Sequence, residues 1–134
     1  MTLPDDLHAA CEATNFAHVA TVLPSGAPHS VPVWIGVEGD RLYFFTQEGT
    51  RKARNLQRDP RVAISISDRK NPYKMVWVRG RVTETRTGDE ALKLIDALAR
   101  RYTGQDFPMR TGVVFLVEPE RSGGMTLPFP PPAD

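Results

Sequence analysis

Short stretches of alternating apolar and polar residues, separated by turns rich in glycine and proline, run through most of this 134-residue chain. Alternation of this kind is typical of a strand with one buried face and one solvated face. Short strands that follow one another through tight turns pair as antiparallel neighbours and favour a barrel. The sequence therefore predicts an antiparallel β fold whose strands span residues 16–23, 28–37, 41–46, 61–68, 73–85, 112–117 and 121–126.

Three helices are expected to flank these strands, at 4–13, 50–59 and 88–102. The first begins with Pro4 and two aspartates, which favour the first turn of a helix. The last repeats Leu92, Ile95 and Leu98 at helical spacing, so it should bury one stripe. The expected fold class is therefore mainly β (α+β), with one domain over residues 1–134. Its Pro-rich tail, 127–134, should be extended or disordered.

Two residues interrupt the strand pattern. Pro32 lies within the second strand, and a proline there indicates a sheet edge, a bulge or a place where a ligand replaces the ladder. Gly80 lies in the middle of the long strand 73–85. An interior glycine indicates a bulge or the close approach of another backbone.

Composition bears on the remaining classes of protein and site. A formal net charge of +1 argues against nucleic-acid binding, and the single cysteine, Cys11, allows no internal disulfide. Neither a signal-peptide pattern nor an apolar run of about 18 residues is seen, so a cytoplasmic protein without a membrane span is expected. His18 and His29 could meet across the first hairpin, but no cluster has ligand spacing and no metal site is predicted.

The stretch 44–56 is the strongest functional signal in the chain. It comprises the end of a strand, a turn that contains glycine, and a helix start with Thr50 as the expected N-cap. Free N–H groups at a helix N-terminus, hydroxyls at Thr46 and Thr50, and cations at Arg51 and Lys52 together suit a phosphate. The same residue types also occur in ordinary capped surface turns.

The surrounding residues are similar to a known phosphate-binding segment. Gly49-Thr50, Arg51-Lys52-Ala53, Asn55-Leu56 and Asp59-Pro60 follow a strand that ends in threonine. This string resembles the segment found in the split-barrel flavin-binding family, the pyridoxamine 5′-phosphate oxidase-like proteins, and the resemblance covers most of residues 14–118. It implies an antiparallel split β-barrel that forms a homodimer, with a cofactor cleft at each end of the interface.

The resemblance also implies which residues surround the cofactor. The strand 29–34 would run beside an isoalloxazine-type ring, with its backbone bonded to the ring edge. The strand 74–82 matches the family's Gly-Arg-Val strand, and residues before Gly80 would reach the cofactor of the partner subunit, although Trp77 could instead be a core residue. No catalytic residue is assigned. The expected cofactor-binding residues are Ser30, Pro32, Val33, Thr46, Thr50, Arg51, Lys52, Asn55, Met75, Trp77 and Arg79.

Two departures from the family pattern separate this chain from the oxidase that makes pyridoxal phosphate. That enzyme has an arginine for the flavin phosphate where His29 or Ser30 stands here, and its Trp/Arg-bearing C-terminal segment is replaced here by a Pro-rich end. The chain looks more like the actinobacterial branch that uses the deazaflavin coenzyme F420. Arginine exceeds lysine, residues 101–104 read Arg-Tyr-Thr-Gly, and small residues near Ser30 leave room for a longer cofactor tail.

The predicted function is accordingly that of an oxidoreductase. It would transfer a hydride from reduced F420 to a small conjugated organic substrate, and a water or a backbone group could supply the proton. One alternative is an FMN-dependent oxidoreductase of the same fold. Another is a protein that binds F420 or a flavin without turnover.

Overall fold

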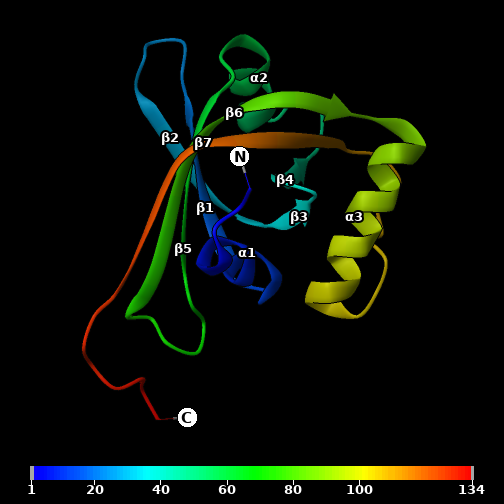
Figure 1. The fold of residues 1–134 in the computed structure, drawn as a ribbon. Coiled ribbons are helices and arrows are strands. Elements are labelled where there is room, and N and C mark those ends of the chain that lie inside the picture. Colours follow the sequence, from blue (N-terminus) through cyan, green and yellow to red (C-terminus); the bar gives the residue numbers. More distant parts are fainter. Residues whose placement is uncertain (1, 134) are drawn as a thin grey trace.

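A seven-stranded antiparallel sheet dominates the computed structural model, which describes residues 2–133 (Figure 1). The strands occur in the order β2-β1-β5-β6-β7-β4-β3, and the sheet curls into a half-barrel with three helices. This arrangement confirms the predicted antiparallel split barrel. The elements are α1 (Asp5–Glu12), β1 (Phe16–Val22), β2 (Pro28–Trp34), β3 (Gly36–Glu38), β4 (Arg41–Thr46), α2 (Arg51–Arg58), β5 (Arg61–Ser67), β6 (Lys74–Arg86), α3 (Gly88–Thr103) and β7 (Val113–Thr126).

The prediction of one strand over 28–37 is wrong, because the chain changes sheet edge at Ile35. β2 and β3 are the two edge strands of the sheet, and Ile35 alone connects them. Its side chain is fully buried, and its N–H donates to the Tyr102 hydroxyl at 3.1 Å. The curl of the sheet therefore brings its two edges together at this residue. Pro32 lies in an edge strand, as one of the predicted alternatives required.

The inside of the curl is filled by the inward side chains of successive strands. Val62, Ile64 and Ile66, which the alternation of β5 places on one face, are all buried. α1 contacts β3, β6 and β7, so this helix joins strands that are distant in the sheet order. α3 packs outside on β7, where Ile95 and Leu98 are fully buried. Both sheet faces are therefore covered in part.

The long strands β6 and β7 are joined through an irregularity at Gly80. The register shifts between Arg79 and Gly80, and a Cβ on Gly80 would lie 2.2 Å from the Glu118 carbonyl oxygen. Both the bulge and the close backbone approach were predicted. The predicted break between residues 117 and 121 is wrong, because β7 continues through Pro119. This proline faces Gly80 at the register shift, where the ladder of hydrogen bonds is already interrupted.

Residues 127–133 form no helix or strand after β7 ends. The Leu127 N–H donates to the Tyr73 carbonyl at 2.9 Å, and the Phe129 ring centroid lies 5.3 Å from that of Tyr73. Asp134, the last residue of the predicted tail, lies outside the described residues. Within residues 2–133, none of the helices combines the length and the apolar character that a membrane crossing requires.

Candidate functional site

The turn between β4 and α2 has the geometry that its sequence predicts. Thr50 is the N-cap of α2, and its Oγ1 accepts from the Ala53 N–H at 3.4 Å. The hydroxyls of Thr46 and Thr50 lie 3.0 Å apart, and Thr50 also donates to the Gln47 carbonyl at 3.1 Å. Gly49 has a φ of +82°, which most other residues avoid. The turn thus carries two linked hydroxyls to the positive end of a helix.

Lys52 gives this turn a cation that lacks a counter-ion. Its side chain is half-buried, and burial lowers the pKa of its ammonium group. No salt bridge between residues 2 and 133 involves it, whereas eight other ion pairs occur there. An anion beside the ammonium would offset the desolvation of the charge. The donors present here, a lysine, two hydroxyls and the first N–H groups of α2, therefore fit the phosphate of a flavin-type cofactor.

Asn55 fastens α2 to the first hairpin. It is fully buried, and its Nδ2 donates to Thr21 Oγ1 at 3.0 Å, while its Oδ1 is without a partner among the described residues. The guanidinium of Arg58 donates to the Val22 carbonyl nearby. His29 is paired with Thr21 across β1 and β2, so both side chains face the same side of the sheet. Of the two residues that could stand where the family has its arginine, His29 therefore lies on the α2 side, and Ser30 lies on the opposite face.

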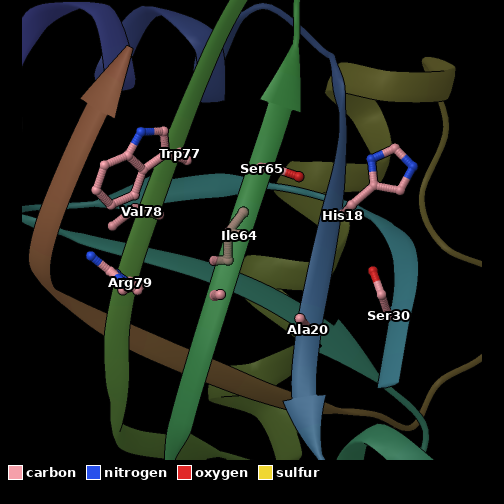
Figure 2. A pocket seen from close by; sticks show the side chains of 9 residues that line it. His18, Ala20, Ser30, Ile64, Ser65, Trp77, Val78 and Arg79 are labelled. Atoms are coloured by element: carbon pink, nitrogen blue, oxygen red, sulfur yellow. The ribbon is translucent and has the colours of Figure 1, made fainter. Parts of the chain in front are cut away.

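A second group of predicted residues lies on the opposite, outer face of the sheet. Ser30, Trp77 and Arg79 line a groove of about 360 Å³ that crosses β2, β1, β5 and β6 (Figure 2). Its floor consists of small side chains, and Figure 2 shows His18 on one side with Trp77 and Arg79 on the other. The remaining lining residues are Ala20, Ala63, Ile64, Ser65 and Val78.

The predicted cofactor-binding residues therefore fall into two sets, one at the β4–α2 turn and in α2, the other on the strands β2 and β6. Thr46, Thr50, Arg51, Lys52 and Asn55 share the turn and α2.

Met75, Trp77 and Arg79 are exposed on β6, three strands away from β2. Three strand spacings amount to about 14 Å. Ser30 and Pro32 of β2 are exposed, whereas Val33 points inward and packs against the core. Within one chain, the β6 residues therefore lie across the sheet from β2.

The other candidate groups form no site among the residues described. His18 lies on the outer face, whereas His29 shares the inner face with Thr21, so the two imidazoles do not meet across the hairpin. Residues 2–133 contain no group of three or more potential metal ligands. Cys11 is fully buried, and burial raises the pKa of its thiol to about 12, which keeps it protonated and unreactive.

Sequence reasoning found Ser30, Trp77 and Arg79 but missed the other residues that line the groove. His18 was considered only as a metal ligand, and Ala20, Ala63 and Ser65 were not considered for a site. The signal was available in part, because the strand 61–68 places the small residues Ala63, Ser65 and Ser67 at alternate positions. Their alignment across neighbouring strands depends on the register, which a single sequence does not give.

Comparison with known proteins points to one family. The family model described as pyridoxamine 5′-phosphate oxidase matches residues 3–123. No match is found among curated proteins. A solved structure named F420 reductase has a TM-score of 0.79 and 29% identity, with 90% of this chain and 98% of that chain covered.

Two mycobacterial structures share the fold at lower identity. Conserved hypothetical protein Rv2991 from Mycobacterium tuberculosis has a TM-score of 0.77 and 22% identity, over 100% of this chain and 94% of that one. A heme binding protein from Mycobacterium smegmatis has a TM-score of 0.62 and 23% identity, over 94% of this chain and 60% of that one. The fold therefore also occurs in a protein that is named for heme binding.

Proposed function

Since this chain belongs to the pyridoxamine 5′-phosphate oxidase-like family, we propose that it is an oxidoreductase that uses reduced coenzyme F420 to reduce a small conjugated organic substrate. The deazaflavin, when bound, supplies the hydride. The protein holds the cofactor, orients the substrate and excludes water. The observation that carries the proposal is the β4–α2 turn with its half-buried Lys52, which has no ion pair with residues 2–133.

Each part of this turn has a role in holding the phosphate. Lys52 and the first N–H groups of α2 supply positive charge, and the hydroxyls of Thr46 and Thr50 supply neutral donors. Arg51 is exposed at the same helix start and would attract the anion over a longer range. The free edge of β2 would lie along the ring. Asn55 orients α2 through Thr21 and so keeps the turn in place.

A homodimer is the second part of the proposal. The outer face exposes four large apolar side chains, Phe16, Met75, Trp77 and Met125, at 38–58% of their surface. Such a patch on β6 and its neighbours favours contact with another protein surface. A second copy would cover it and bring Trp77 and Arg79 to the partner's β4–α2 turn. Light scattering should report a dimer, and dilution should weaken cofactor binding; a monomer with full affinity would contradict this part.

F420 is favoured over FMN by the residue at the start of β2. The position of the family's arginine falls here on His29 or Ser30, and neither side chain gives the turn a permanent cation. A phosphodiester carries less charge than the flavin phosphate and requires fewer cations. The anionic tail of F420 would also be attracted by exposed cations on α2, such as Arg54 or Arg58, in a salt-dependent way.

Parallel titration with both cofactors at one ionic strength tests this choice. We expect tighter binding of F420. Tighter binding of FMN, or FMN copurified at one per subunit, would establish the FMN-dependent alternative. Arg51 and Lys52 together supply enough positive charge to hold the FMN phosphate. Turnover of conjugated enones with reduced cofactor separates both enzymes from a protein that only binds the cofactor.

A further inference from the structure

Two arginines lie directly opposite each other on the outer face. Arg79 of β6 is paired in register with Arg121 of β7, and both side chains are exposed. No salt bridge between residues 2 and 133 involves either of them. Like charges in directly opposite positions destabilise a sheet. Repulsion between Arg79 and Arg121 therefore lowers the stability of the folded protein unless an anion binds between them.

A neighbouring pair of arginines has its charges compensated by carboxylates of the same chain. Arg61 of β5 and Arg81 of β6 are also opposite in register. Arg61 pairs with Asp59 at 2.7 Å, and Arg81 pairs with Glu120 at 3.3 Å. Among residues 2–133, carboxylates thus neutralise Arg61 and Arg81 and leave Arg79 and Arg121 as an uncompensated pair.

The uncompensated pair lies at one side of the groove, next to an aromatic surface. The Arg79 guanidinium carbon is 5.1 Å from the centroid of the Trp77 ring. Gly123, opposite Trp77 on β7, gives the indole its space, because a Cβ there would lie 2.8 Å from Trp77 Nε1. Figure 2 shows Trp77 and Arg79 on the same side of the groove. The floor of the groove is formed by β5 and β1, with Ala63, Ser65 and Ala20.

We propose that Arg79 and Arg121 bind the carboxylate of a planar, conjugated substrate whose ring system lies over the small side chains of the groove beside Trp77. The planar guanidinium matches a carboxylate with two parallel hydrogen bonds. The methyl groups of Ala20 and Ala63 and the face of the indole suit an apolar ring. Inorganic phosphate would pair with the two arginines but would leave the apolar floor of the groove exposed to water, so a carboxylate attached to an apolar ring fits the site better.

The substrate assignment rests on the proposed function, because the groove would face the cofactor held at the partner's turn. The carboxylates of the F420 tail offer the same chemistry to the two arginines. A test must therefore measure the small carboxylate and the cofactor separately.

The experiment is calorimetric titration of the full-length, cofactor-free protein with trans-cinnamate and with its neutral isostere, trans-cinnamamide. We expect the wild type to bind the carboxylate at least about tenfold more tightly, since a charge-assisted hydrogen bond contributes this much. Arg79→Gln and Arg121→Gln should each remove the preference, and Arg79→Lys should keep part of it. The matched control is Arg81→Gln, which should bind both compounds as the wild type does.

Each outcome decides the proposal. Loss of the preference in both glutamine variants, with unchanged F420 affinity in Arg121→Gln, supports a substrate site. A wild type without a preference, or a preference that survives Arg79→Gln, overturns it. Weaker F420 binding in the variants, without any cinnamate preference in the wild type, assigns the arginines to the cofactor tail instead. If the wild type binds neither F420 nor FMN, the proposed function fails, while the cinnamate titration still reports on the groove.

Discussion

Replacement of Lys52 by methionine should separate cofactor binding from folding. Lys52 is half-buried at the first turn of α2 and has no ion pair with the described residues. Methionine keeps the apolar stem and removes only the charge. If the ammonium donates to the cofactor phosphate, its loss should remove a charge-assisted hydrogen bond of about 1.5–3 kcal/mol. That energy corresponds to a roughly ten- to hundredfold weaker affinity.

Without cofactor, replacement of Lys52 by methionine should leave the stability of the folded protein unchanged or increase it. Burial lowers the pKa of Lys52 below its unfolded value, so the folded state binds this proton less strongly than the unfolded state does. The charged lysine therefore opposes folding at neutral pH, and this opposition fades as the pH rises through its folded pKa. The variant should be at least as stable as the wild type in urea at pH 7, and its stability should depend less on alkaline pH.

The assay is fluorescence titration with F420 and with FMN, alongside urea unfolding without cofactor. Lys93→Met is the matched control, because Lys93 is exposed on another helix, α3. It removes the same charge and should change neither affinity. Equal affinity of Lys52→Met and the wild type for both cofactors, with the fold intact, would refute the assignment of the turn as the phosphate site.

Three further substitutions test the scaffold. Gly80→Ala should destabilise the protein by about 1–3 kcal/mol in urea unfolding, because the new methyl group meets the Glu118 carbonyl and overpacking has a cost of this size; an unchanged midpoint would contradict the close approach. Tyr102→Phe should lose about 1–3 kcal/mol, since two backbone groups at the change of sheet edge lose their partner; a wild-type unfolding curve would contradict the role of this hydroxyl. Hydrogen bonds from Arg110 lower the pKa of the Asp96 carboxyl, so its contribution to stability is present above the unfolded pKa and is lost as the pH falls through the folded one. In Asp96→Asn, the free energy of unfolding should therefore fall less steeply as the pH is lowered. The same pH dependence in this variant and in the wild type would show that the Asp96–Arg110 pair does not contribute to acid unfolding.

The β4–α2 turn could be predicted because all of its causes are local. The cap, the glycine and the cations lie within seven positions, from Thr46 to Lys52, and the hydrogen bonds between Thr50 and its neighbours follow from that spacing. The same holds for the alternation of β5 and for the glycine in β6. What the sequence did not show is that Lys52 has no counter-ion in the described part of the chain, because this depends on which acidic residues the fold brings near it.

The strand boundaries that sequence reasoning misplaced are those set by distant partners. Ile35 belongs to an unbroken apolar stretch, and only the hydroxyl of Tyr102, 67 residues later, marks the change of sheet edge. Pro119 reads as a strand end, but the bulge at Gly80 on the neighbouring strand accommodates it within β7. Local propensity gives no information about a partner strand.

The sequence by itself determined the alternating strands, the capped helix and the cationic turn, since each depends on residues a few positions apart. Only the tertiary structure decided how the candidate residues divide. The alternation of β6 places Trp77 and Arg79 on the outer face, whereas Asn55 attaches α2 to Thr21 on the inner face. The register of β6 against β7 places Arg121 beside Arg79. The physical reason is that side-chain direction reverses at each residue of a strand, so one step of register decides which charges meet and which face they share.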